Sequence, residues 1–385
     1  MKDSIRFKLI SFANCLVPKN SNKCFFYDRG MISYNEISML TWASDNQLVK
    51  KYQMIYYTNN PTAARKMFPE TVKIISNPIK GFFHQLSSKY VFVEQNGHQW
   101  MCRPAHKQLM VQLWHGTPIK KVGNLNHTTH WFSYDDVFSR VLAPSEYAWS
   151  IMRKCFSYSD NKKIICPYPR CDELLSQNAK DLRKKLGLDD KSRIGVWLPT
   201  FRTAYYETHG SNDAPDFPIL TENNINILNG LLKRSNTTVI VKMHVLQRRL
   251  PFFDTNYSNI IFMDNAALVD MEMSLYSLLG ASDCLISDYS SVIFDYLLVN
   301  KPIVFTVDDY YSYKDHRGFI DEDMFNNVPG PTAHDVEELV NSIESVLTKD
   351  AYESERNTLC RKMNKEEIRL GDYAATVFRQ LGIEK

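Results

Sequence analysis

The sequence of 385 residues lacks several features that would define common classes of protein. It has no run of about 18 apolar residues, so no membrane-spanning helix is predicted. It has no GxSxG motif and no Walker loop, which excludes a nucleophile-elbow hydrolase and a P-loop enzyme. The eight cysteines form no CxxC pair and none has metal-ligand spacing to a histidine. We therefore predict reduced, buried thiols in a cytosolic protein.

Charge of either sign is not in excess, because 46 basic residues are matched by 43 acidic ones. This balance does not predict nucleic-acid binding. Hydrophobic residues make up 44% of the chain and charged residues 23%, which is typical of a globular protein. The length exceeds that of one ordinary hydrophobic core and predicts two domains.

Short apolar runs alternate with helical patterns along the chain, which is typical of parallel sheets covered by helices. The first series of expected strands is 24–27, 54–57, 90–94, 109–114, 140–143 and 163–166, and the second is 194–198, 238–243, 260–262, 284–287 and 302–305. The pattern predicts an α/β fold with two Rossmann-like domains facing a central cleft.

The domain boundary is expected near Pro167 and Pro169, because proline lacks a backbone donor and restricts the preceding residue. We predict an N-terminal domain over residues 1–170 and a C-terminal domain over 171–365. The helix expected at 366–385 is a candidate to rejoin the first domain.

The N-terminal segment combines a short apolar run at residues 9–17 with preceding basic residues. In a helix, one stripe would carry Ile5, Leu9, Phe12 and Leu16. Two interpretations stay open: packing of this stripe on its own domain, which we favour, and an anchor lying in a membrane interface.

The segment Trp114-His115-Gly116-Thr117-Pro118 follows an apolar run. Glycine permits tight backbone geometry, and proline suits the first turn of a helix. His115 is thus expected at the carboxyl end of a strand, where it can accept a proton from a hydroxyl near neutral pH. The alternative is a histidine that only caps or packs the turn.

A second candidate site follows the expected strand at 284–287. Asp288, Ser290 and Ser291 are N-cap candidates for a helix over 292–299. Backbone N–H groups and the helix dipole favour an anion there, and two hydroxyls add donors for phosphate oxygens. Ordinary capping without a ligand is the alternative.

Three further segments carry candidate phosphate ligands. His244 and Lys242 end the strand at 238–243, and Arg202 follows Thr200 in the turn after 194–198. The guanidinium of arginine suits phosphate. The alternatives are a packed His244, a solvated Lys242 and an interdomain salt bridge for Arg202. Arg317 either binds phosphate or holds a loop.

Two other chemistries compete with phosphate binding. Asp321-Glu322-Asp323 resembles the metal-binding carboxylate pair of many sugar-nucleotide transferases, but no clear apolar strand precedes it. We predict a solvated acidic turn. A Ser/His/Asp hydrolase would need Ser290 and His244 within hydrogen-bonding reach, and nothing in the sequence places them so.

The motifs together resemble the CDP-glycerol glycerophosphotransferase family of teichoic-acid and capsule synthesis over residues 25–325. The matching blocks, in order, are residues 114–118, Pro169-Arg170-Cys171-Asp172, Pro199-Thr200-Phe201-Arg202, Lys242-Met243-His244, Asp288-Tyr289-Ser290-Ser291 with Phe294-Asp295-Tyr296 and Lys301-Pro302, and Arg317-Gly318-Phe319. The chain departs from the family pattern at Pro167, Cys171 and Val245.

The resemblance implies a two-domain GT-B fold, a CDP-polyol donor and chemistry without an essential metal or cofactor. It implies that His115 deprotonates the acceptor hydroxyl, while His244 and the Ser290/Ser291 helix end hold the donor pyrophosphate. The expected site is catalytic His115 and His244, donor-binding Thr200, Arg202, Asp288, Ser290, Ser291 and Arg317, and acceptor-side Gly116, Thr117 and Lys120.

The predicted function is transfer of glycerol-phosphate or ribitol-phosphate from a CDP-activated donor to a hydroxyl of a lipid-linked saccharide or polyol-phosphate polymer, with release of CMP. The enzyme is expected to act as a peripheral protein at the inner face of the cytoplasmic membrane. Two alternatives remain open: a GT-B glycosyltransferase that uses a nucleotide sugar, and a non-catalytic nucleotide- or polysaccharide-binding protein.

Overall fold

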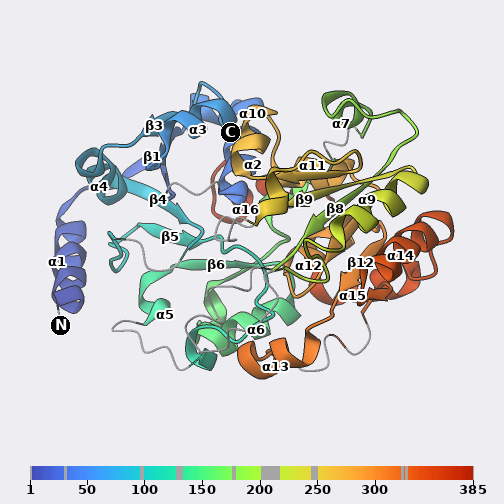
Figure 1. Ribbon diagram of the computed structural model, residues 1–385. Helices are drawn as coiled ribbons and strands as arrows, with labels where there is room; N and C mark the ends of the chain where they lie inside the picture. Colours follow the sequence, from blue (N-terminus) through green and yellow to red (C-terminus); the bar gives the residue numbers. More distant parts are fainter. Residues whose placement is uncertain are drawn as a thin grey trace. The chain divides into compact units, whose positions relative to one another are not determined.

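The computed structural model of the protein describes residues 2–29, 33–95, 99–126, 133–175, 179–200, 217–243, 250–321, 325 and 328–384. The side chains of residues 2, 3, 316 and 317 lie outside this description. The chain forms two compact units (Figure 1). Unit 1 comprises Met1–Glu173 and Lys362–Lys385, and unit 2 comprises Leu174–Arg361.

Unit 1 is built on a seven-stranded sheet of order β3-β2-β1-β4-β5-β6-β7, in which every pairing is parallel. The strands are β1 (Asn20–Tyr27), β2 (Gln53–Tyr57), β3 (Lys73–Ile75), β4 (Ser88–Val93), β5 (Leu109–Gln112), β6 (Arg140–Ala143) and β7 (Lys163–Ile165). The helices are α1 (Lys2–Leu16), α2 (Tyr34–Asp45), α3 (Pro61–Met67), α4 (Pro78–Ser87), α5 (Tyr134–Val137), α6 (Glu146–Phe156) and α16 (Tyr373–Gln380). Short 3₁₀ turns are η1 (Leu48–Lys50), η2 (Gly123–Asn126), η3 (Asp160–Lys162) and η4 (Pro169–Leu175).

Unit 2 is built on a six-stranded sheet of order β10-β9-β8-β11-β12-β13, again with parallel pairings. The strands are β8 (Arg193–Leu198), β9 (Thr237–Lys242), β10 (Ile260–Met263), β11 (Cys284–Ser287), β12 (Ile303–Thr306) and β13 (Thr332–Ala333). The helices are α7 (Ala179–Lys185), α9 (Ile225–Arg234), α10 (Asn265–Asp270), α11 (Leu275–Ala281), α12 (Val292–Tyr296), α13 (Tyr310–Arg317), α14 (Val336–Thr348) and α15 (Glu353–Met363). Two 3₁₀ turns are η5 (Pro251–Asp254) and η6 (Leu297–Val299).

Strands buried on both faces explain the apolar runs in the sequence, because helices cover both sides of a parallel sheet. In unit 1 the stacked rings of Phe26 and Phe92 join β1 to β4, with their centroids 4.5 Å apart. In unit 2 the fully buried Trp197 lies in one apolar cluster with residues of α9 and α14. The prediction of an α/β fold with two parallel sheets is confirmed.

The order of strands reverses direction once in each sheet, between β1 and β4 in unit 1 and between β8 and β11 in unit 2. Unit 2 has the strand order of a Rossmann fold, and unit 1 extends that order by one strand. Ligands of such sheets bind beyond the carboxyl ends of the strands at this reversal. The carboxyl ends of the strands near the reversal are therefore the expected positions of a ligand-binding site.

The cysteines and the N-terminal helix test two predictions. All eight cysteines are free, and seven are buried, but Cys15 is exposed.

The stripe on α1 does not pack on its own domain: Ile5, Leu9, Phe12 and Leu16 are 52–67% exposed. The helix does pack on its own unit, as favoured, but the expected packing face was wrong, because the opposite face, with Phe7 and Asn14, is the buried one. Among the described residues, none of the helices has the length and apolarity needed to cross a membrane.

The C-terminal segment returns to unit 1 and is fastened there by Asp172. Its carboxylate oxygens accept hydrogen bonds from the backbone N–H groups of Gly371 (2.9 Å), Tyr373 (3.1 Å) and Ala374 (2.9 Å). These groups lie at the start of α16, where N–H groups have no partner within the helix. Asp172 thus caps a helix about 200 residues further along the chain.

Replacing Asp172 with alanine is expected to loosen the C-terminal segment. Three backbone donors would lose their acceptor, which corresponds to about 3 kcal/mol of unfolding free energy. Hydrogen–deuterium exchange of Tyr373–Gln380 should become much faster. The matched control is Asp372→Ala, because Asp372 stands at the N-cap position of α16 without a side-chain cap hydrogen bond. Equal exchange in both variants would contradict the role given to Asp172.

Candidate functional site

The predicted His115 lies in a turn that follows β5 at the carboxyl edge of the unit 1 sheet. The strand was expected to reach residue 114 but ends at Gln112. The chain leaves the sheet because Trp114 adopts a left-handed backbone with φ of 57°, and Gly116 has φ of 129°. A non-glycine residue in this region costs about 1–2 kcal/mol and persists only where its surroundings hold it.

Buried side chains hold the peptide groups of Trp114. Its N–H donates to the side-chain oxygen of Gln112 (2.9 Å), and its carbonyl accepts from the side-chain amide of Asn35 (2.7 Å). Gln112 and Asn35 are both fully buried. The strained backbone is therefore fixed by hydrogen bonds on both sides, from β5 and from α2.

The orientation of the His115 ring follows from one hydrogen bond. Nδ1 lies 3.2 Å from the backbone carbonyl oxygen of Glu94, which is only an acceptor, so Nδ1 carries the proton. Nε2 then has its lone pair available. The ring stacks on Trp114 with centroids 4.2 Å apart, and solvent still reaches the side chain.

The surroundings of His115 favour the neutral form of its imidazole. Desolvation lowers its pKa from the ordinary value, the positive charge of Arg170 lowers it further, and the Glu94 carbonyl acts in the opposite direction. A neutral ring with a free Nε2 at neutral pH has the properties that a general base needs.

The expected acceptor-side residues share this turn. Gly116 is buried and Lys120 is half-buried. Thr117 is 1% exposed, and its hydroxyl has no hydrogen-bond partner among the described residues. These residues follow His115 closely in the chain, and the structure buries Gly116 and the hydroxyl of Thr117.

Sequence reasoning missed a cluster of acidic residues beside the turn. Asp28 follows β1, Glu94 follows β4, and Glu36 lies in the first turn of α2. Desolvation raises the pKa of Glu94 to about 7, against the opposing charge of Arg170, and raises that of Glu36 well above its usual range. The signal in the sequence was an acidic residue directly after an apolar run, as in Tyr27-Asp28 and Val93-Glu94.

In unit 2, Thr200 and Asp288 meet across the reversal of strand order. Thr200 follows β8, and its backbone N–H donates to both carboxylate oxygens of Asp288, which follows β11, at 3.0 and 2.8 Å. The hydroxyl of Thr200 donates to the same carboxylate. Asp288 is fully buried. The two residues therefore join the ends of neighbouring strands.

Ser290 and Ser291, the serines of the second predicted site, follow Asp288 closely in the chain. Ser291 occupies the N-cap position of α12, but its side chain makes no cap hydrogen bond, and Ser290 and Ser291 are half-buried. The helix expected over 292–299 is the five-residue α12 followed by the 3₁₀ turn η6. Both hydroxyls lie at the carboxyl edge of the sheet near the strand-order reversal.

Lys242 ends β9 at the same edge and is only 7% exposed. Burial lowers its pKa to about 8, and its ammonium donates to the carbonyl of Met243 (3.0 Å). The alternative of a solvated Lys242 was therefore wrong. Its neighbour His244 lies outside the described residues, as do Arg202, Glu322 and Asp323, and so does the side chain of Arg317 on α13.

The pKa of Glu94 has a consequence for stability. The folded chain binds this proton more tightly than the unfolded chain, so the stabilisation is complete below pH 4.5 and is lost as pH rises through about 7. In the native protein, deprotonation of Glu94 should lower the unfolding free energy by about 3 kcal/mol between pH 4.5 and 7.5. Glu94→Gln should remove this fall. Urea denaturation of both proteins at the two pH values measures the difference. Parallel declines in the two proteins would contradict the raised pKa.

The sequence matches, over residues 9–367, the family described as CDP-glycerol:poly(glycerophosphate) glycerophosphotransferase. It is 24% identical over 377 residues to a teichoic acid poly(glycerol phosphate) polymerase of Bacillus spizizenii, covering 92% of this chain and 90% of that protein. It is 27% identical over 309 residues to a teichoic acid glycerol-phosphate primase of Bacillus subtilis, covering 76% of each chain.

The fold is similar to that of the wall teichoic acid polymerase TagF, with a TM-score of 0.73 and 17% identity. The match covers 99% of this chain and 93% of that structure, and it agrees with the predicted GT-B-like class of two α/β halves. The family match extends over nearly the whole chain, including the His115 turn and the Asp288–Ser291 segment. The chain therefore belongs to the CDP-glycerol:poly(glycerophosphate) glycerophosphotransferase family and is a polyol-phosphate transferase.

Proposed function

We propose that this transferase uses His115 as the general base that activates an acceptor hydroxyl. The observation that carries the proposal is the hydrogen bond from Nδ1 of His115 to the Glu94 carbonyl, which leaves the lone pair of Nε2 available in a ring whose lowered pKa favours the neutral form. The acceptor oxygen attacks the β-phosphorus of a CDP-activated polyol, and its proton passes to Nε2. The bond between that phosphorus and the bridging oxygen breaks, and CMP leaves.

The donor phosphates are proposed to bind at the carboxyl edge of the unit 2 sheet. Ser290 and Ser291 supply hydroxyl donors, and Lys242 supplies a positive charge in a buried setting where electrostatic interactions are strong. Asp288 is given a different role from the one expected, because a carboxylate repels phosphate and its oxygens accept from Thr200. It positions the Thr200 turn. His244, Arg202 and Arg317 remain proposed phosphate ligands from the sequence.

The identity of the polyol is proposed from the relatives. Glycerol-phosphate enzymes are among them, and so is a teichoic acid ribitol-phosphate primase of Bacillus spizizenii, 27% identical over 261 residues. A form of the TagF polymerase was solved after soaking with CDPG. A CDP-activated polyol is therefore the proposed donor, and a lipid-linked saccharide or polyol-phosphate polymer is the proposed acceptor.

His115→Ala is expected to leave the fold intact and to lower CMP release from CDP-glycerol or CDP-ribitol at least about 100-fold, which is typical for loss of a general base. His334→Ala is the matched control, because His334 is exposed in unit 2. In the native enzyme, kcat/KM should fall on the acid side only below pH 6.5, since His115 must be neutral and its pKa is lowered. Near-normal CMP release by His115→Ala would exclude it as the base.

A panel of donors separates the proposed function from its alternatives. CDP-glycerol, CDP-ribitol and UDP-sugars are each incubated with the enzyme and an acceptor, and the released nucleotide is identified. CMP from a CDP-polyol supports the proposal. UDP from a UDP-sugar would indicate a glycosyltransferase, and tight nucleotide binding without any release would indicate a binding protein.

The exposed apolar surface of unit 1 is proposed to rest on a membrane. Six of the nine large hydrophobic side chains that are exposed in the described part of the chain lie on two helices in contact, α1 and α4 (Figure 1). They are Ile5, Leu9, Phe12, Leu16, Ile79 and Phe83. Exposed apolar patches of this kind mark interaction surfaces, and here exposed basic residues, Arg6, Lys8 and Lys80, accompany them.

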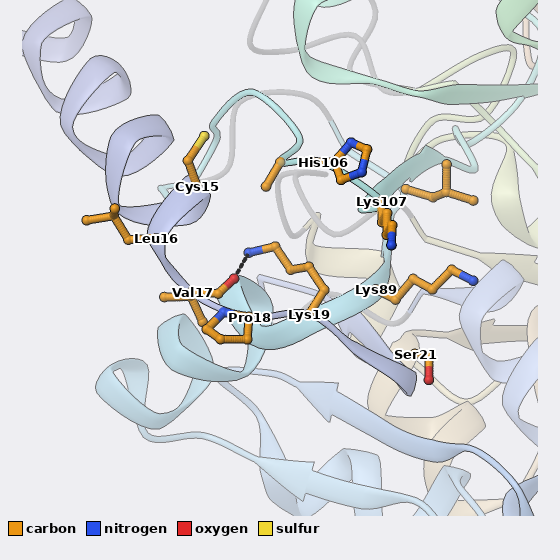
Figure 2. Close-up of a pocket in the computed structure, with 11 residues that line it drawn as sticks. Cys15, Leu16, Val17, Pro18, Lys19, Ser21, Lys89, His106 and Lys107 are labelled. Carbon is orange, nitrogen blue, oxygen red and sulfur yellow. Dashed lines mark hydrogen bonds between the residues drawn. The ribbon is translucent and has the colours of Figure 1, made fainter.

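A cavity of about 630 Å³ adjoins the end of this apolar stripe. Figure 2 shows Leu16 of α1 on one side of it, with Lys89, His106 and Lys107 on the other. The ammonium of Lys19 holds the end of α1 by donating to the carbonyls of Asn14 and Val17. The described residues that line the cavity include lysines and no acid, so the phosphates of anionic lipids are the proposed partner.

The double variant Leu9→Ser/Phe12→Ser should lower binding to vesicles of anionic phospholipid at least about tenfold, because two large apolar side chains no longer leave water. Co-sedimentation measures the bound fraction. Ile227→Ser is the matched control, since Ile227 is a large apolar side chain that is 52% exposed on α9 in unit 2. Equal sedimentation of the native protein and the double variant would remove the membrane proposal and leave the transferase proposal untouched.

A further inference from the structure

The side chain of Asn35 has all its hydrogen-bonding groups in use. Its amide nitrogen donates to Oε1 of Glu94 (2.8 Å) and to the carbonyl oxygen of Trp114 (2.7 Å). Its carbonyl oxygen accepts the backbone N–H of Arg170 (3.2 Å). The chemistry fixes this orientation, because a reversed amide would place an oxygen against two acceptors and a nitrogen against a donor.

Glu94 anchors this arrangement from the end of β4. Besides Asn35, its carboxylate accepts the hydroxyl of Ser33 and lies 3.9 Å from the guanidinium of Arg170. Its backbone carbonyl accepts Nδ1 of His115. Glu94 therefore contacts the His115 ring through its backbone carbonyl. Through Asn35, its carboxylate is also linked to the carbonyl of Trp114, the residue before His115.

The polar side chains of this arrangement are buried near the reversal of strand order. Asn35, Glu94 and Arg170 are each no more than 8% exposed. Burial of polar groups is unfavourable unless each is satisfied, and here the satisfied network ends on the left-handed Trp114. The network therefore stabilises one conformation of the turn that carries His115.

We propose that Asn35 and Glu94 are positioning residues for the transfer reaction: Asn35 clamps the Trp114 carbonyl, Glu94 fixes Asn35 and the His115 ring, and together they aim Nε2 at the acceptor hydroxyl. Neither side chain touches the substrate. The proposal rests on His115 as the base, and it assigns to α2 and to the end of β4 a part in the reaction that no sequence motif pointed to.

Asn35→Asp tests the clamp with almost no change in shape. It replaces the donor with an acceptor that faces the Glu94 carboxylate and the Trp114 carbonyl. We expect kcat to fall about 10- to 100-fold, because a misplacement near 1 Å has an effect of that size. The KM for the CDP-activated donor should stay within about twofold, since Asn35 is not among the proposed donor ligands. Glu94→Ala should give the same pattern by releasing Asn35.

A second substitution separates positioning from general stability. Adding Glu94→Gln to Asn35→Asp removes the repulsion and supplies an amide donor to the new carboxylate, so the melting temperature should recover. The Trp114 carbonyl still lacks its donor, so kcat should stay low. A role in stability alone predicts that kcat recovers together with the melting temperature, and that outcome would overturn the proposal.

The matched control is Gln108→Ala, which removes another buried side chain of unit 1 that makes several hydrogen bonds. Gln108 accepts from Asn14 and donates to the carbonyls of Gln85 and Ser88, near the start of β4 and β5 and away from His115. Its loss should lower the melting temperature with kcat unchanged when assayed well below that temperature. A fall in kcat as large as that of Asn35→Asp would also overturn the proposal.

Imidazole ¹⁵N NMR gives a readout that does not need turnover. The His115 signals, assigned by comparison with His115→Ala, should show the Nδ1–H tautomer in the native protein. In Asn35→Asp they should shift toward a mixture of tautomers. Unchanged signals together with unchanged kcat would exclude positioning by Asn35. Native tautomer signals in an enzyme that releases no CMP would instead count against the proposed function.

Discussion

A strand that ends at the edge of a parallel sheet leaves the peptide groups of the next residues without a ladder partner, and both units depend on how these groups are satisfied. In unit 1 the amide of Asn35 and the side chain of Gln112 take up both peptide groups of Trp114. In unit 2 the carboxylate of Asp288 takes up the N–H of Thr200. In both units, buried side chains near the reversal of strand order fix the turns that carry the candidate site residues.

The carboxyl edges of the two sheets differ in the charged groups that they carry. Unit 1 gathers Asp28, Glu36 and Glu94, and their burial raises the pKa values of Glu36 and Glu94. Unit 2 presents the hydroxyls of Ser290 and Ser291 and the buried ammonium of Lys242. A neutral base beside acids suits an acceptor hydroxyl, and donors with a cation suit phosphates. The proposed division of roles between the units therefore agrees with the electrostatics of each.

The block Pro169-Arg170-Cys171-Asp172 has a structural explanation in this fold. Arg170 supplies a backbone donor to Asn35 and a guanidinium near Glu94, and Asp172 caps α16. Cys171 is buried between them. The block therefore joins the His115 network to the segment that closes unit 1, which gives a physical reason for this block in a transferase of this family.

The sequence by itself determined the two parallel sheets, because strands buried on both faces require apolar runs, and it placed His115 and the Asp288–Ser291 segment at strand ends. It did not reveal β3 and β13, which are three and two residues long. The roles of Asn35, Glu94 and Asp172 were decided only by tertiary structure, since their partners lie up to about 200 residues away. The exposure of the α1 stripe was also decided there, because periodicity defines the two faces of a helix but not which of them packs.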